Sequence, residues 1–146
     1  MSEPRNGPAE GPGPDQPAIR VTLMPKDTNA YGTIFGGIIL SYIDQAGAIE
    51  AHRYSNGRLV TVAMREVEFH APVFVGDLVS FYTETIAVGT TSLTVRVTVE
   101  AARALGRGHV KVTEAEVVYV QVDADGEPTP IEPAVPEDDR ASAGDG

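Results

Sequence analysis

Residues 24–37 read MPKDTNAYGTIFGG, and residues 38–53 continue directly as IILSYIDQAGAIEAHR. The first part has the polar residues of a turn and ends in a glycine pair, whereas the second part is apolar on nearly every side of a helix. A helix that is apolar all round is typical of a buried position. We therefore expect one long buried helix that begins near 35–37 and ends near 54–57, where Ser-Asn-Gly is a stop signal.

Asp44 places a carboxylate in the middle of this apolar helix. An unpaired carboxylate in an apolar setting is costly, so something must compensate for it. The residues alone leave two explanations open. Either Asp44 takes part in catalysis, or it forms a structural ion pair with Arg53 or Arg65.

Outside the helix, the hydrophobic pattern changes from helical to alternating. Five segments alternate and are predicted to be strands: 19–23, 59–69, 78–88, 92–100 and 109–122. The last four follow one another through short links, which favours antiparallel neighbours. One helix and five antiparallel strands predict an α+β domain whose sheet wraps around the helix. Such a sheet has open edges, so we expect at least a homodimer.

The two ends of the 146-residue chain differ in composition from its middle. Residues 1–17 and 123–146 are rich in Pro and Gly, so we expect flexible tails around a domain at 18–122. The tails carry most of the net charge of −10, with −7 in the C-terminal tail and −2 in the N-terminal tail. The domain itself is nearly neutral, which argues against non-specific binding to nucleic acid.

Composition also narrows the chemistry. The chain has no cysteine, which excludes disulfides, thiolate catalysis and cysteine-ligated metals. The three histidines, His52, His70 and His109, lack a ligand-like spacing, so we expect no metal site. There is no signal-peptide pattern and no apolar segment of about 18 residues, so we expect a cytoplasmic protein that does not cross a membrane.

Two further candidates lie at the start of the helix. The first amides of a helix lack internal partners and lie at its positive end, so Gly36-Gly37 is suited to bind an oxyanion, although glycine pairs also serve tight packing. Asp44 follows Gly37 by roughly 10 Å of axial rise, on a similar face. Asn29 lies in a polar turn, where an Asx-turn is the simpler explanation.

A longer pattern joins these residues. Residues 24–37 have the form MPxDTNxxGxIFGG and are followed by IDxAG at 43–47. Further matching segments are VTV at 60–62, FxxPVxVGD at 69–77, Tyr82, GTTS at 89–92 and KVTEA at 111–115. In this order and spacing they resemble the hotdog-fold acyl-coenzyme A thioesterases, and more narrowly the bacterial short-chain and the cytosolic acyl-CoA hydrolases. The resemblance covers about residues 19–131.

The resemblance implies a hotdog fold, in which a five-stranded antiparallel sheet wraps around one long central helix. It also implies hydrolysis of acyl-CoA thioesters to a free carboxylic acid and coenzyme A. Asp44 would be the general base or, less favoured, a nucleophile; Asn29 would position substrate or water, and Gly37 would be the backbone donor to the oxyanion. In dimers of this family, Asn29 of one protomer meets Asp44 of the other, and close relatives often form trimers of dimers.

Coenzyme A is part of the substrate, so no separate cofactor is expected. For its binding, the resemblance suggests Gly36, Arg58, Thr61, Gly89, Thr90 and Ser92. Further candidate cations for its phosphates are Arg96, Arg103, Arg107 and Lys111.

Two other functions have to be weighed. Phe35 stands where many hotdog enzymes have a histidine, which argues against dehydratase or isomerase chemistry. The alternative that is not an enzyme is a non-catalytic acyl-CoA-binding module or regulator. Regulators of that kind carry an extra DNA-binding segment, and the short acidic tails of this chain do not resemble one.

Overall fold

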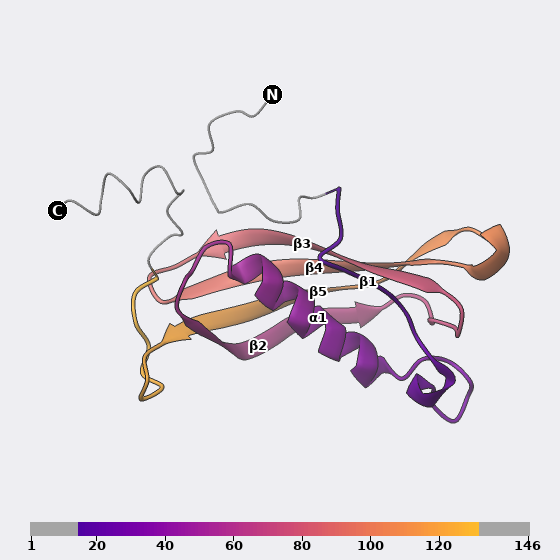
Figure 1. Ribbon diagram of the computed structural model, residues 1–146, viewed down its shortest axis with the longest axis horizontal. Coiled ribbons are helices and arrows are strands. Elements are labelled where there is room, and N and C mark those ends of the chain that lie inside the picture. Colours follow the sequence, from indigo (N-terminus) through magenta and orange to yellow (C-terminus); the bar gives the residue numbers. More distant parts are fainter. Residues whose placement is uncertain (1–14, 132–146) are drawn as a thin grey trace.

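The computed structural model describes residues 15–131 of the chain. In chain order its elements are β1 (Ile19–Thr22), η1 (Pro25–Asp27), α1 (Gly36–Ala51), β2 (Arg58–Phe69), β3 (Leu78–Val88), β4 (Ser92–Ala102), η2 (Ala104–Gly106) and β5 (His109–Val122), where η1 and η2 are short 3₁₀ turns. Figure 1 shows α1 lying across one face of a curved sheet. This arrangement confirms the expected α+β architecture with the sheet curled around a helix.

The helix begins where the sequence predicts but ends earlier. Its last residue is Ala51, whereas the predicted end was near 54–57. The amides of Arg53 and Tyr54 donate to carbonyls three residues back, each at 3.0 Å, so the chain tightens into a turn after the helix. The stop signal at 55–57 therefore forms the link to β2 and not the last turn of the helix.

The strands form one antiparallel sheet in the order β1-β3-β4-β5-β2. The strands β3, β4 and β5 are neighbours as predicted, but β2 pairs with β5 and not with β3. The expectation that β2 and β3 are neighbours is wrong because the link at 70–77 crosses the sheet and does not form a hairpin. The crossing spans three strand spacings, roughly 14 Å, which an extended chain of this length covers easily.

This link is held at three of its residues. The amide of Ile34, just before the helix, donates to the carbonyl of Val73 at 2.8 Å. From the end of β4, Arg103 donates to the carbonyl of Pro72 at 3.0 Å and forms an ion pair with Asp77. The link thus ties the loop before α1 to the end of β4.

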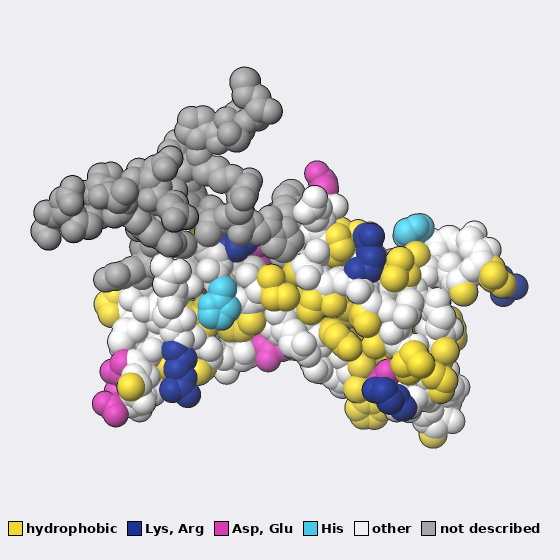
Figure 2. Space-filling view, viewed as in Figure 1, with side chains coloured by type: hydrophobic (Ala, Val, Ile, Leu, Met, Phe, Trp, Pro, Cys, Tyr) yellow, Lys and Arg dark blue, Asp and Glu magenta, His cyan; other side chains and the backbone are white. Residues whose placement is uncertain are grey.

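One side of α1 and the concave face of the sheet form the core. Residues 95–102 of β4 alternate between buried and more exposed, as expected for a sheet covered on one face. The helix contributes Ile39, Ile43 and Ala46 to this core. Its opposite side is exposed and includes Ser41, Gln45 and Ile49; Figure 2 shows hydrophobic side chains gathered over this side of the molecule. The helix expected to be buried all round is therefore buried on one side only within a protomer.

The chain stays on the domain after β5. The amide of Thr129 donates to the carbonyl of Gln121 at 2.8 Å, and the side-chain amide of Gln121 donates to the carbonyl of Pro130 at 2.9 Å. The amide of Ile131 then donates to the carbonyl of Thr90 at 2.8 Å. Residues 123–131, expected to be part of a flexible tail, are therefore docked. Residues 1–14 and 132–146, which make up the rest of both expected tails, lie outside the described residues.

Two features of residues 15–131 bear on function. No helix in this range has the length and apolar character needed to cross a bilayer. In the same range, no group of three or more His, Cys, Asp or Glu side chains is arranged to hold a metal ion.

Candidate active site

Asp44 lies in the middle of α1 and is partly exposed. Its Oδ1 accepts a hydrogen bond of 2.7 Å from Thr61 Oγ1 on β2 and a longer one of 3.3 Å from the Tyr119 hydroxyl on β5. Its Oδ2 accepts no hydrogen bond from the residues that the structure describes. Arg53, one of the two expected ion-pair partners, pairs with Glu50 at 2.8 Å. Asp44 thus has one restrained oxygen and one open oxygen, which suits a general base.

Tyr119 anchors this part of the helix to the sheet. Its hydroxyl donates to the backbone carbonyl of Asp44 at 2.7 Å, and its side chain is only 1% exposed. Burial, followed by the charge of the neighbouring Asp44 and the hydrogen bond to it, raises the pKa of Tyr119 well above its usual range. The phenol therefore remains protonated and acts as a donor.

Gly47 makes room for this tyrosine. A Cβ placed at position 47 would lie less than 3.0 Å from the Tyr119 hydroxyl and 3.2 Å and 3.3 Å from two ring carbons. A real Cβ does not approach other atoms so closely, so any larger residue would push Tyr119 away from Asp44. The glycine of the IDxAG segment is explained by this contact.

The glycine pair lies at the first two positions of α1. In the described part of the chain, neither Gly36 nor Gly37 donates a backbone hydrogen bond to a residue outside the helix, and amides at these positions have no partner within it. Gly37 is exposed, and the Phe69 ring lies beside Gly36, 3.6 Å from where a Cβ would stand. Both amides are free to bind an anion at the positive end of the helix.

Asp44 and the glycine pair are too far apart to act on one carbonyl group within a protomer. Seven residues of helix separate Asp44 from Gly37, which is roughly 10 Å along the axis. A general base and an oxyanion donor each have to lie about 3 Å from the atoms they serve.

Asn29 closes the loop before the helix. Its Oδ1 accepts hydrogen bonds from the amides of Tyr31 at 2.8 Å and Thr33 at 3.2 Å, and its Nδ2 donates to Thr33 Oγ1 at 2.8 Å. This is the Asx-turn that the sequence suggested. None of these hydrogen bonds links Asn29 to Asp44 of the same protomer, and the second N–H of Nδ2 is left for another partner.

The residues suggested for coenzyme A fall into separate groups. Thr61 contacts Asp44 directly, and Gly36 lies at the start of the helix. Gly89, Thr90 and Ser92 form the β3–β4 turn, in which the amide of Gly89 donates to the carbonyl of Ser92 at 2.7 Å. Arg58 begins β2 opposite Val122, at the same end of the sheet as this turn and at the opposite end from Gly36 (Figure 1).

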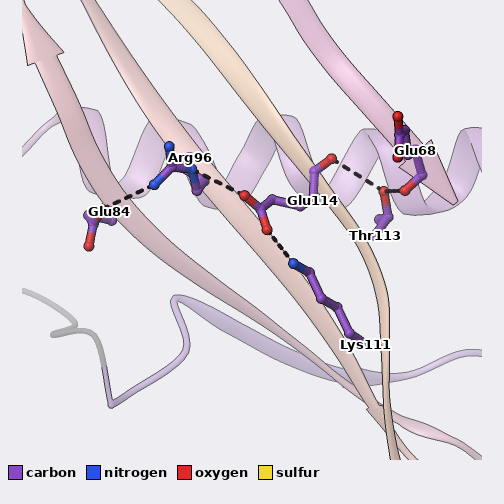
Figure 3. Close-up of polar contacts among 6 residues, drawn as sticks. All are labelled: Glu68, Glu84, Arg96, Lys111, Thr113 and Glu114. Atoms are coloured by element: carbon purple, nitrogen blue, oxygen red, sulfur yellow. Dashed lines mark hydrogen bonds and ion pairs between the residues drawn. The ribbon is translucent and has the colours of Figure 1, made fainter. Parts of the chain in front are cut away.

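Three of the other candidate cations are already paired with carboxylates. Arg96 forms ion pairs with Glu84 at 3.5 Å and with Glu114 at 3.2 Å, and Lys111 pairs with Glu114 on the face of the sheet away from α1 (Figure 3). Arg103 pairs with Asp77. Arg58 and Arg107 are exposed and form no ion pair with another described residue, which leaves these two as the more available cations.

Sequence reasoning missed two residues near the site. Glu50 is 2% exposed and accepts hydrogen bonds from Arg53 and from Thr85 Oγ1, each at 2.8 Å. It is the buried carboxylate of α1. Because it stands in the same apolar run as Asp44, the sequence could have indicated that it is buried and paired. Tyr119 could be identified as inward-facing from the alternation in β5, but its helix partner could not.

Comparison with known proteins adds independent information. Residues 31–106 match the family described as the thioesterase superfamily. The acyl-CoA thioester hydrolase YciA of Salmonella typhimurium is 43% identical over 117 residues, which cover 77% of this chain and 87% of the relative. Among solved structures, Cj0915, a hexameric hotdog fold thioesterase of Campylobacter jejuni, is 47% identical with a TM-score of 0.74 and covers 80% of this chain and 90% of its own. The hexameric thioesterase y2039 of Yersinia pestis is 36% identical with a TM-score of 0.75, covering 88% and 98%.

Proposed function

Because this chain belongs to the thioesterase superfamily and is an acyl-CoA thioester hydrolase, we propose that Asp44 is its general base and that the amides of Gly36 and Gly37 bind the oxyanion. The observation that carries this proposal is the carboxylate of Asp44, held at Oδ1 by two hydroxyl groups while Oδ2 remains open. No other carboxylate of α1 is available, since Glu50 is buried and paired.

The chemistry follows from these groups. Asp44 takes a proton from a water molecule, and the resulting hydroxide adds to the thioester carbonyl carbon. The carbonyl oxygen becomes an oxyanion, which the free amides at the start of α1 stabilise. The carbon–sulfur bond then breaks, and the leaving thiolate of coenzyme A takes the proton back from Asp44, which regenerates the base as the free carboxylic acid is released. These steps need no cofactor, because coenzyme A enters and leaves as part of the substrate.

We also propose that each site joins two protomers. The separation of Asp44 from the glycine pair along one helix supports this, because a second copy supplies the missing group. In this arrangement Asn29 and Gly37 of one protomer face Asp44 of the partner, and the remaining N–H of Asn29 binds the substrate carbonyl or the water. The open edge of β2 and the exposed side of α1 provide the surface for the pairing.

Pairs of protomers are proposed to assemble further. The thioesterases of Campylobacter jejuni and Yersinia pestis are described as hexameric. A trimer of dimers gives the same number of subunits and keeps the two-fold pairing that the site needs. Light scattering at several protein concentrations measures the mass; a stable monomer that turns over substrate would contradict both the hexamer and the shared site.

The base is tested with Asp44→Asn, which keeps the shape of the side chain but removes its basicity. We expect kcat to fall by roughly a hundredfold or more while the substrate still binds. The assay follows the release of free thiol from a panel of acyl-CoA chain lengths, which also defines the preferred acyl chain. Asp125→Asn, an exposed substitution in the turn after β5, is the matched control. Near-normal turnover by Asp44→Asn would remove Asp44 from the mechanism.

The shared site is tested by mixing two inactive variants. Asn29→Ala and Asp44→Ala are unfolded together in equal amounts and refolded. Half of randomly formed dimers are mixed, and each mixed dimer has one intact site, so activity recovers to roughly a quarter of that of the parent. If both residues serve a site within one protomer, every site carries a lesion and mixing recovers nothing. Mass spectrometry verifies that mixed dimers have formed.

A further inference from the structure

We propose that Tyr119 is a positioning residue, which together with Thr61 holds Oδ1 of Asp44 so that Oδ2 is the oxygen that faces the attacking water. This inference rests on the proposed function of Asp44 as the base. It assigns separate roles to the two carboxylate oxygens and gives a buried residue of β5 a part in the reaction.

The two hydroxyl groups come from one cross-strand pair. Thr61 on β2 and Tyr119 on β5 are directly opposite each other in the antiparallel register, and both hydroxyl groups contact the same oxygen of Asp44. Thr61 donates to Oδ1 directly, whereas Tyr119 shares its single proton between Oδ1 and the closer backbone carbonyl. The side chains of such a pair lie on the same face of the sheet, here the face that α1 covers. The sheet therefore presents two donors to one helical residue from adjacent strands.

The hydroxyl of Tyr119 restrains more than the carboxylate. It lies 2.7 Å from the backbone carbonyl of Asp44 and 3.3 Å from its Oδ1, so one group fixes the carboxylate relative to its own backbone. Within one protomer, Thr61 is on the edge strand β2 and is exposed, whereas Tyr119 is fully buried between β5 and α1. Tyr119 is accordingly the rigid member of the pair, and rigid support is what a catalytic base needs to keep its geometry.

Two features keep this arrangement in one state. The raised pKa of the Tyr119 phenol keeps its proton in place, so the group stays a donor. Gly47 leaves space for the ring and hydroxyl next to the helix backbone. With Oδ1 occupied by two donors, the lone pairs of Oδ2 are the ones left to accept a proton from water.

The test uses Tyr119→Phe, which removes the hydroxyl and keeps the ring. Losing a hydrogen bond that orients the base is expected to lower kcat about tenfold with KM changed less than about twofold. Tyr82→Phe is the matched control, because Tyr82 pairs with Thr98 on the face of the sheet away from α1; its kinetics should equal those of the parent. A kcat of Tyr119→Phe within about twofold of the parent overturns the proposal.

A second arm separates positioning from a merely structural role. Tyr119→Phe is also made in the Asp44→Asn background, and the residual activity of the two enzymes is compared. If Tyr119 acts through the carboxylate, the second change alters residual activity less than about twofold. The same tenfold loss in that background would mean that Tyr119 supports the fold and not the base, which overturns the proposal. If Asp44→Asn alone retains normal turnover, Asp44 is not the base. That result refutes the proposed role of Asp44 separately from the role of Tyr119.

Discussion

Replacing Gly47 with alanine tests the contact between α1 and β5 directly. Alanine is the better helix former, and by propensity alone it should stabilise a helix interior by about 1 kcal/mol. The added Cβ, however, would lie less than 3.0 Å from the Tyr119 hydroxyl and 3.2 Å from the nearest ring carbon. Either the helix moves off the sheet or the tyrosine ring turns away from Asp44.

The expected cost can be worked from these contacts. Overpacking a core position costs about 1–3 kcal/mol, and losing the hydrogen bond from Tyr119 to the carbonyl of Asp44 costs about 1 kcal/mol. Against the gain in helix propensity, the net loss in the free energy of unfolding is about 2 kcal/mol. In the Tyr119→Phe background the hydroxyl is absent and only the two ring carbons at 3.2 Å and 3.3 Å crowd the added Cβ, so the same substitution should cost clearly less there.

Equilibrium unfolding in urea, followed by far-UV circular dichroism at a fixed protomer concentration, gives the free energy of unfolding of each protein. The proteins compared are the parent, Gly47→Ala, Tyr119→Phe and the variant that carries both substitutions. Gly36→Ala is the control for stability, because a Cβ at that position meets the Phe69 ring at an ordinary 3.6 Å; its free energy of unfolding should stay within about 0.5 kcal/mol of the parent. A Gly47→Ala variant as stable as the parent, or one equally destabilised with and without the Tyr119 hydroxyl, would show that the close contact with Tyr119 does not set the cost.

Three further outcomes are expected. Thr83→Val should stabilise the protein by about 1 kcal/mol, because the Thr83 hydroxyl is buried without a hydrogen-bond partner in the described residues; a lower melting temperature would reveal a partner. Glu50→Ala should cost about 1.5–3 kcal/mol, because the buried carboxylate accepts hydrogen bonds from Arg53 and from Thr85 Oγ1; an unchanged midpoint in urea unfolding would show that these contacts contribute nothing. Deleting Met1–Ala9 and Asp138–Gly146, which lie outside the described residues, should leave turnover and melting temperature nearly unchanged; a loss of either would show that a tail is needed.

Local patterns predicted the elements because each pattern is set by nearby residues. The bounds of β3 and β5 agree with their alternating segments, and Asp44 was identified from an apolar helix interrupted by a carboxylate. The order of the strands in the sheet could not be predicted from local patterns. The rule that short links join neighbours is statistical, and the link after β2 is long enough to cross the sheet, where contacts with distant residues decide its path.

The site shows the same division between local and long-range information. The turn at Asn29 and the free amides at Gly37 follow from local geometry, and both are present as expected. Thr61 was suggested for coenzyme A, which stays a prediction, and its hydrogen bond to Asp44 was not predicted from the sequence. That contact, like the one from Tyr119, depends on how α1 sits over the sheet, which is decided by packing between segments far apart in the chain.

The position of β2 in the sheet also has a consequence during protein synthesis. Its hydrogen-bonded partner within the chain is β5, the last strand to leave the ribosome. At typical translation rates residues 70–122 take about 3–10 s to appear, and throughout that time β2 has no strand beside it. Charged residues such as Arg65 and Glu68 on this strand oppose premature pairing with other nascent chains. Folding is therefore completed only by the final strand, and a chain that terminates before residue 109 should leave β2 unpaired and available for aggregation.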